Sequence, residues 1–254
     1  MAGMAQRFAD LGLAAPDPEI PISATPGWSL TDVFGHVMME VNRYRELATG
    51  RGDWPADVAD LPAFNAEQIR TLPTRDVGEL AARLRTGTEE LVATIDAFGD
   101  EQPLMPFDGD QWVRADRQLG TLLGELVVHG RDIARETGAA WPIDREHVPL
   151  VFDGLHQVLP GWVGPDARGH TATYQLRLRG DLGRYVYAFA DGRLTINPAE
   201  PPAIDVHVSA DPVTALLSSY RRIGRWWPAL SGKTLAWGRR PWLAARLNDR
   251  FRSP

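Results

Sequence analysis

The spacing of the apolar residues changes near residue 142, and this change constrains the fold more than any other feature of the sequence. Before it, apolar residues recur at helical intervals over three long segments, whereas after it shorter segments alternate apolar and polar residues as strands do. The sequence therefore predicts an α+β chain: a helical bundle over residues 1–142, followed by a smaller domain over residues 143–254 with an antiparallel sheet and a helix packed on one face.

Three long helices are predicted in the first domain. One begins after the N-cap Ser29 and ends near Ala48, because Gly50 follows. The other two cover about 77–98 and 117–137. A weaker helix is expected near the N-terminus, so the bundle should have a short first member.

The connections between these helices show little periodicity. Residues 51–74 are rich in Pro and Asp, and we expect only a short helix near residues 66–70. A connection of this length in a compact domain often covers a site. Residues 100–116 are expected to be irregular.

The second domain should begin with one more helix, over residues 145–159. Strands are predicted around residues 174–178, 186–189, 194–196 and 206–208, with a hairpin turn at Asp191-Gly192. Asp211 followed by Pro212 predicts the start of a helix. The C-terminal tryptophans are expected to pack in the core and between the domains: Trp226, Trp227, Trp237 and Trp242.

The composition excludes several classes of function. The chain has no cysteine, so it cannot form a disulfide or supply a thiolate as ligand or nucleophile. Its formal net charge of −6 makes nucleic acid a poor candidate for the partner. The sequence contains neither an apolar run of about 18 residues nor a secretory signal, so we expect no membrane partner and a cytoplasmic location.

Glu125 and His129 form the pair that points to chemistry. They are four residues apart on the third long helix, so their side chains project only about 40° apart around its axis. Asp132 follows on the same stripe and could accept a hydrogen bond from the ring of a ligating histidine. His36, on the first long helix, could complete a divalent-metal site in the groove between the two helices.

This spacing has a simpler interpretation as well. A Glu and a His four residues apart are common on plain solvated helix surfaces, and His36 alone could be an ordinary core or surface histidine. Three protein ligands, however, are what a catalytic metal usually takes, because this leaves positions open for water or substrate.

Two segments, GWSLTDVFGH over residues 27–36 and GELVVHGRDIA over residues 124–134, resemble the mycothiol-dependent maleylpyruvate isomerase family. That family has a DinB-like N-terminal helical bundle in which two histidines and a glutamate bind a divalent metal, usually taken as zinc. The resemblance implies this role for His36, Glu125 and His129. The segments ADPVTALL over residues 210–217 and GRRPWL over residues 238–243 are similar to the family's C-terminal domain, which is itself similar to sterol carrier proteins.

The resemblance also implies a thiol cosubstrate, mycothiol, the low-molecular-weight thiol of actinobacteria. A thiol that binds the metal loses its proton more readily and becomes a better nucleophile. With an unsaturated acid such as maleylpyruvate, this would give cis–trans isomerisation; with another electrophile, it would give S-transfer. Arg221 and Arg222, at the end of the helix that begins after Asp211, could bind a substrate carboxylate, with Arg222 the preferred candidate. A solvated helix end, where arginine complements the dipole, is the alternative.

Two other functions stay open on the sequence alone. The chain could be a non-catalytic binding protein whose second domain encloses an apolar ligand. It could also be a metal-dependent hydrolase that uses metal-bound water and needs no thiol.

Overall fold

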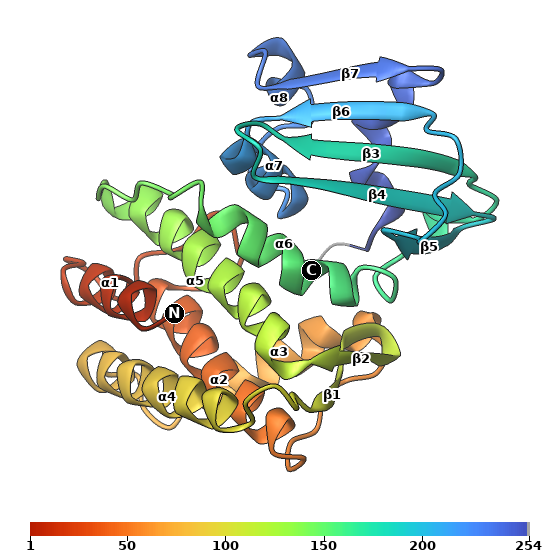
Figure 1. The fold of residues 1–254 in the computed structure, drawn as a ribbon. Helices are drawn as coiled ribbons and strands as arrows, with labels where there is room; N and C mark the ends of the chain where they lie inside the picture. Colours follow the sequence, from red (N-terminus) through yellow and green to blue (C-terminus); the bar gives the residue numbers. More distant parts are fainter. Residues whose placement is uncertain (253–254) are drawn as a thin grey trace. The chain divides into compact units, whose positions relative to one another are not determined.

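The structure, a computed structural model, describes residues 1–252. It contains two compact units, Met1–Ile143 and Asp144–Pro254. The first unit is mainly helical, and the second holds a five-stranded sheet with helices (Figure 1). The predicted α+β class is confirmed.

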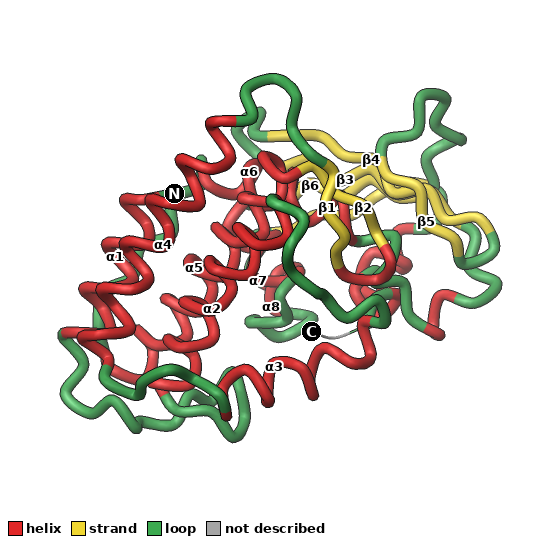
Figure 2. Tube along the Cα trace, turned by 90° about the horizontal axis from the view of Figure 1, so that it is seen from below, coloured by secondary structure: helices red, strands yellow, loops and turns green. Residues whose placement is uncertain are grey.

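Four helices of the first unit form a bundle: α1 (Ala2–Leu13), α2 (Leu30–Ala48), α4 (Val77–Ala97) and α5 (Ala115–Thr137). Both α1 and α2 pack against α4 and α5, and Figure 2 shows the four running side by side. The three long helices agree with the prediction to within two residues at each end. Gly138 adopts the left-handed conformation (φ 71°) that ends α5.

The first helix is short, as expected, yet it is well packed. Phe8 is fully buried and stacks on Phe34 of α2, with ring centroids 4.9 Å apart. Gly12 lets the Phe34 ring pack directly against α1, because a Cβ atom at this position would lie 2.4 Å from Cε2 of Phe34. The position of the Phe34 ring therefore requires a glycine at residue 12 of α1.

Replacing Gly12 with alanine is expected to destabilise the protein. The added methyl group would overlap the Phe34 ring, and overpacking of this kind lowers the free energy of unfolding by about 1–3 kcal/mol. Gly3→Ala is the matched control, because the same helix offers open space there, with no atom within 4 Å, and alanine favours helix by up to about 1 kcal/mol. Urea titration of both variants measures the difference. Equal stability of the two would contradict this account of the α1–α2 contact.

The connection before α4 holds more helix than predicted. A 3₁₀ turn, η1 (Val58–Asp60), leads directly into α3 (Leu61–Arg70). Asp57 caps the start of this segment by accepting a hydrogen bond from the Ala59 backbone N–H.

The expectation of an irregular segment over residues 100–116 was wrong. Strands β1 (Leu104–Phe107) and β2 (Gln111–Arg114) form an antiparallel hairpin. Gly109 and Asp110 both have positive φ, 66° and 58°, and make the turn. Both strands have only four residues, and β1 contains Pro106, so the alternation of apolar and polar residues is too short to indicate a strand.

The second unit begins with α6 (His147–Val158), as predicted. Its sheet has the strand order β5-β4-β3-β6-β7. The strands are β3 (Ala172–Leu178), β4 (Gly183–Ala190), β5 (Arg193–Ile196), β6 (Val206–Ala210) and β7 (Thr234–Gly238). Asp191 and Gly192 form the predicted turn between β4 and β5, with φ of 50° and 82°.

The sheet is antiparallel except for one central pair. After the β4–β5 hairpin the chain crosses to the other side of β3, and β6 runs parallel to β3 with Tyr174 beside Val206. Tyr174 and Val206 are fully buried. Helix α7 (Pro212–Ser219) follows, and Asp211 caps it as predicted by accepting a hydrogen bond from the Thr214 backbone N–H.

The four C-terminal tryptophans are not core residues, contrary to the prediction. Trp226 and Trp227 lie at the start of the short helix α8 (Trp227–Leu230), Trp237 is in β7, and Trp242 is in the 3₁₀ turn η4 (Pro241–Arg246). Their exposed fractions lie between 48% and 65%. They are exposed because β7 is the outermost strand of the sheet on that side, and α8 and η4 pack beside it.

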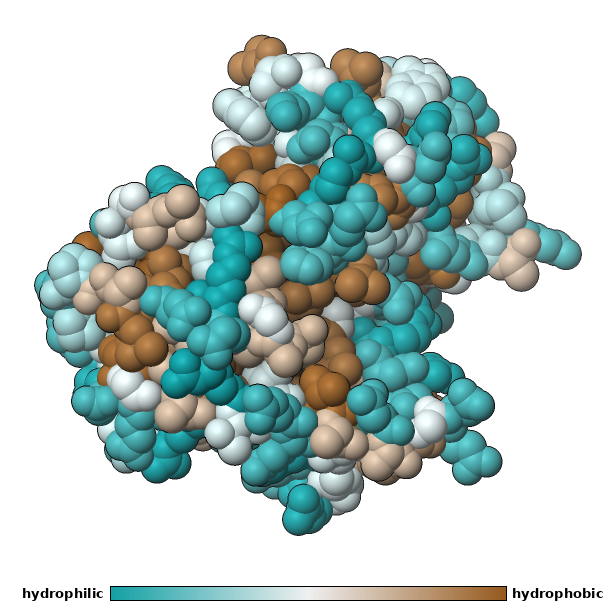
Figure 3. All heavy atoms as spheres, turned by 60° about the vertical axis from the view of Figure 1, so that its left-hand side comes forward, coloured by the Kyte–Doolittle hydropathy of each residue, from teal (hydrophilic) through white to brown (hydrophobic). Residues whose placement is uncertain are grey.

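Hydrophobic residues also reach the surface elsewhere. On the face drawn in Figure 3, hydrophobic residues (brown) are interspersed among hydrophilic ones (teal). Among the helices of residues 1–252, none combines the length and apolar character that a bilayer crossing requires.

Candidate metal centre

Helix α5 holds Glu125 and His129 on one face. Oε2 of Glu125 lies 3.1 Å from Nε2 of His129. Gly130, the next residue, faces Trp141, whose indole N–H donates a hydrogen bond to the carbonyl of Val127 at 2.9 Å. This contact fixes the part of α5 that carries the pair.

Helix α2 brings His36 to the same point. Ser29 and Asp32 start the helix with a capping box, in which each side chain accepts a hydrogen bond from the other residue's backbone N–H. His36 is buried, and its Nε2 lies 3.8 Å from Oε2 of Glu125. The indole of Trp28 covers the ring, with centroids 5.2 Å apart.

The three predicted ligands therefore meet. One donor atom from each of His36, Glu125 and His129 lies within 4.8 Å of the others. Both histidines are buried, while Glu125 is partly exposed.

Each imidazole has a polar side chain beside its other nitrogen. Nδ1 of His36 lies 3.0 Å from Oε1 of Gln68, so the ring N–H donates there and Nε2 keeps its lone pair toward Glu125. Nδ1 of His129 lies 3.7 Å from Oδ2 of Asp132, an ion-pair distance. Asp132 was predicted for this position. Gln68 was missed, although it lies in the long connection whose length indicated that it covers a site.

A buried ion pair lies next to His36 and was also missed. Oε1 of Glu40 accepts a hydrogen bond from Arg43 at 2.8 Å and lies 3.9 Å from Nδ1 of His36. The Arg43 guanidinium lies over the rings of Trp54 and Phe64, 4.5 and 4.1 Å from their centroids. The available signal was the spacing of His36, Glu40 and Arg43 on one helix face.

The charges of the pair on α5 reinforce each other. Burial alone would lower the pKa of His129, but the carboxylates of Asp132 and Glu125 outweigh it and raise the pKa to about 9. Burial alone would raise the pKa of Glu125, but the two histidines outweigh it and hold the pKa well below its usual range. Without a bound cation, the pair is therefore an imidazolium and a carboxylate at neutral pH.

We expect metal affinity to rise with pH, because binding must displace the proton of His129. With a pKa of about 9, the apparent affinity should rise about tenfold per pH unit up to about pH 9 and then level off. Isothermal titration calorimetry at several pH values measures this slope. A flat profile across this range would contradict the assigned protonation.

The stability of the metal-free protein should fall as the pH rises toward 9, whereas the metal affinity should increase over the same range. The raised pKa of His129 contributes stability that is complete below the unfolded value of 6.5 and is lost as the pH rises through about 9. The lowered pKa of Glu125 contributes stability that is present above 4.5 and is lost as the pH falls. Thermal melts of chelator-treated protein should therefore show a maximum between these limits.

The donor set fits a divalent metal such as zinc. Zinc takes imidazole nitrogen and carboxylate oxygen at about 2.0–2.2 Å, so two of its ligands lie about 3.3 Å apart. The observed separations of Glu125 Oε2 from the two Nε2 atoms, 3.1 and 3.8 Å, are close to this value. Three protein donors leave further coordination positions open.

Arg222 lies in the other compact unit, within residues 144–254. It follows α7, and its Nη1 donates a hydrogen bond to the carbonyl of Tyr220 at 2.9 Å. Arg221 donates to the backbone carbonyls of Asn248 and Phe251. A role for Arg222 in binding a substrate carboxylate stays a prediction.

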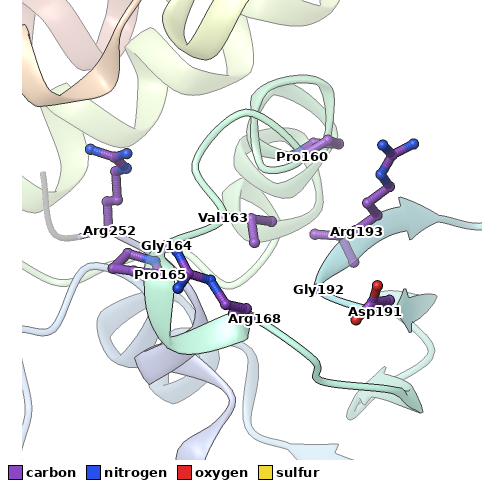
Figure 4. A pocket seen from close by; sticks show the side chains of 10 residues that line it. Pro160, Val163, Gly164, Pro165, Arg168, Asp191, Gly192, Arg193 and Arg252 are labelled. Atoms are coloured by element: carbon purple, nitrogen blue, oxygen red, sulfur yellow. The ribbon is translucent and has the colours of Figure 1, made fainter.

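A surface recess of about 660 Å³ lies in the second unit (Figure 4). Its arginine side chains extend in different directions and do not converge on one point. It holds none of the predicted site residues, so we place the candidate chemistry at the three donors instead. The recess is lined by Pro160, Val163, Gly164, Pro165, Arg168, Asp191, Gly192, Arg193, Leu194 and Arg252.

Comparison with known proteins places this geometry in a family. The model of the mycothiol maleylpyruvate isomerase N-terminal domain matches residues 3–134, which include all three donors. The chain belongs to this family. The predicted membership in the mycothiol-dependent maleylpyruvate isomerase family is confirmed.

A solved structure supports the fold of this family member. A crystal structure of a mycothiol-dependent maleylpyruvate isomerase is 16% identical, with a TM-score of 0.50, over 85% of this chain and 84% of that chain. A crystal structure of a mutant of that isomerase is also 16% identical over the same shares, with a TM-score of 0.49. No curated protein sequence matches the chain. At this identity the likeness establishes the fold alone.

Proposed function

We propose that this chain is a divalent-metal-dependent enzyme that activates an external thiol, mycothiol, for cis–trans isomerisation of an unsaturated acid or for S-transfer to an electrophile. Family membership supports the class of reaction. The proposed setting is the cytoplasm, where low-molecular-weight thiols are kept reduced.

The observation that carries this proposal is the convergence of three donor atoms from two helices, with a polar side chain beside the far nitrogen of each imidazole. A surface Glu–His pair without a metal role would not need a third donor within 4.8 Å. It would also not need Gln68 to orient the ring of His36 from a separate helix. The arrangement is typical of a site that is built to hold an ion.

We propose zinc as the metal, held by Nε2 of His36, Nε2 of His129 and the carboxylate of Glu125. When bound, it would act as a Lewis acid that favours the thiolate form of an incoming thiol at neutral pH. The chain itself has no cysteine, so the sulfur must come from a cosubstrate.

The chain's own residues have defined tasks in this proposal. Oε1 of Gln68 accepts a hydrogen bond from Nδ1–H of His36, and Asp132 lies beside Nδ1 of His129, so both Nε2 atoms are presented to the ion. Trp28 covers His36 and limits access of water to that side of the site. Arg222 is our candidate for the substrate carboxylate.

The sulfur chemistry balances without any other reactant. In isomerisation, the thiolate adds to one carbon of the activated double bond, the remaining single bond rotates, and the same carbon–sulfur bond breaks. The double bond and the thiolate are then restored. In S-transfer, the carbon–sulfur bond is kept and the electrophile's leaving group departs.

Activity assays with and without thiol test this proposal. We expect the purified protein to isomerise maleylpyruvate only when mycothiol and the metal are both present. Treatment with a chelator should abolish the reaction, and added zinc should restore it. His147→Ala, which changes a histidine of the second unit, is the control for a general effect of histidine removal.

Other outcomes would decide between the alternatives. Hydrolytic activity that needs the metal but no thiol would overturn the proposal in favour of a hydrolase. Tight binding of an apolar ligand by protein without metal, with no turnover of any thiol-dependent substrate, would overturn it in favour of a binding protein.

A further inference from the structure

Six large apolar side chains are exposed along one edge of the second unit's sheet. We call them the tryptophan edge. Strand β7 is outermost, with α8 packed beside it (Figure 1), and η4 packs against β6 and β7. The tryptophan edge consists of six residues that lie in α8, in β7, in η4 or just before α8: Trp226, Trp227, Leu230, Leu235, Trp237 and Trp242.

The exposed apolar area is large for a protein of this size. Leu230 is 85% exposed, Trp242 65% and Trp226 61%. The four tryptophans together expose more than two whole side chains, or roughly 450 Å², before the leucines are added. Exposed apolar area of this amount along one edge is often functional on a single chain.

The segment that carries most of this edge is strongly basic. Residues 221–252 contain nine Arg and Lys residues and a single carboxylate, Asp249. The rest of the chain has 18 basic and 32 acidic residues, a net charge of −14. Asp249 lies 2.5 Å from Arg225, and Asp205, from outside the segment, lies 3.8 Å from Arg239. The nine cations of the segment therefore still outnumber these two carboxylates.

From this combination we propose that the tryptophan edge binds the surface of an anionic lipid bilayer. Tryptophan rings favour the interface between headgroups and acyl chains, the exposed leucines would enter the apolar layer, and the cations would face the anionic headgroups. The expectation of no membrane partner rested on the absence of a spanning segment, which a surface contact does not need.

Charge argues against a second copy of the chain as the occupant. The free edge of β7 could pair with β7 of another copy only in the antiparallel direction if the two are related by a two-fold axis. In the register that pairs the whole of β7, with the axis at Ala236, Lys233 of one copy would lie beside Arg239 of the other. Like charges opposite each other destabilise such a pairing.

The leucines argue against nucleic acid. Aromatic rings and arginine would suit exposed bases and phosphates. Leu230 and Leu235 have no face on which a base can stack, and they gain free energy only by moving from water into an apolar medium. The acyl layer of a bilayer offers that medium.

Sedimentation with lipid vesicles tests the proposal on the full chain. We expect binding to phosphatidylcholine vesicles that contain about 30% phosphatidylserine and much weaker binding to pure phosphatidylcholine, because anionic headgroups attract the cations. Raising the salt concentration from about 0.05 M to about 0.5 M should weaken the binding, since salt screens surface charges. Equal binding to both vesicles, or none to either, would overturn the proposal.

Substitutions within the edge locate the contact. The triple variant Trp226→Ala, Trp227→Ala, Leu230→Ala should bind anionic vesicles at least tenfold more weakly. Trp112→Ala is the matched control, because Trp112 is 66% exposed in β2 of the first unit. Circular dichroism should show native folding of both variants. An equal loss of binding in the Trp112 variant would overturn the proposal.

The cations are tested separately. Lys233→Gln and Arg239→Gln should each weaken vesicle binding about fivefold, while Arg83→Gln on α4 should leave it unchanged. Lipids with a nitroxide label should quench the tryptophan fluorescence of the wild type and not of the triple variant. A dimer that the triple variant loses, or tighter binding to a single-stranded oligonucleotide than to anionic vesicles, would overturn the assignment to lipid.

Discussion

Replacing His129 with alanine is expected to lower the metal content of the purified protein from about one ion per chain to almost none. His129 supplies one of only three donors, and the remaining pair, His36 and Glu125, would hold the ion at a separation of 3.8 Å without support from a third side. Activity should fall with the metal, because the thiol would no longer be activated. Elemental analysis and the isomerase assay on the same sample measure both effects.

The Gln68→Ala variant tests whether Gln68 positions the ring of the proposed ligand His36. Loss of an outer hydrogen-bond partner of a ligating histidine usually costs about 10–100-fold in metal affinity. We therefore expect this variant to retain metal at saturation but to lose it to a competing chelator much sooner than the wild type. A Gln68→Ala variant with unchanged affinity would show that the 3.0 Å contact with His36 does not orient the ring.

The control for both variants is His147→Ala, which lies in α6 of the second unit. Its metal content should equal that of the wild type. If the His129→Ala variant also retained a full equivalent of metal, the ion would lie elsewhere, and the proposed function would lose its main support.

Arg43→Ala is expected to destabilise the first unit by about 3–5 kcal/mol, because it leaves a buried carboxylate without its partner. Glu40 is 4% exposed and accepts a hydrogen bond from Arg43 at 2.8 Å. Burial lowers the pKa of the Arg43 guanidinium, and the Glu40 carboxylate opposes this effect. The variant would also remove the cation that lies over the rings of Trp54 and Phe64.

A double variant distinguishes a broken ion pair from lost packing. Glu40→Gln combined with Arg43→Met removes both charges and keeps most of the volume, so it should be clearly more stable than Arg43→Ala alone. Arg83→Ala, which breaks the exposed pair with Glu79, is the surface control and should cost less than about 1 kcal/mol. Urea unfolding followed by fluorescence measures all three. Equal costs for Arg43→Ala and Arg83→Ala would contradict the account.

The ion pair also links stability to the candidate site. Oε1 of Glu40 lies 3.9 Å from Nδ1 of His36, so a displaced carboxylate would compete with Gln68 for the ring N–H. We therefore expect Arg43→Ala to weaken metal binding as well as folding, which the same chelator competition can measure.

The sequence by itself determined the features that depend on near neighbours along the chain. The three long helices follow from apolar spacing, and their starts and ends from residues such as Ser29 and Gly138. The juxtaposition of Glu125 and His129 is a property of one helix, and the turn at Asp191-Gly192 is a property of two residues. Local backbone geometry decides all of these, so a linear pattern contains them.

Tertiary structure alone decided the features that join distant segments. The contact of Gln68 with His36 depends on how α3 folds back over the bundle, and the parallel pairing of β6 with β3 depends on where the chain crosses the sheet. The exposure of Trp237 depends on β7 being the outermost strand, which composition cannot reveal. Such contacts arise from packing between elements, and the free energy of packing depends on the three-dimensional arrangement of side chains, not on their order along the chain.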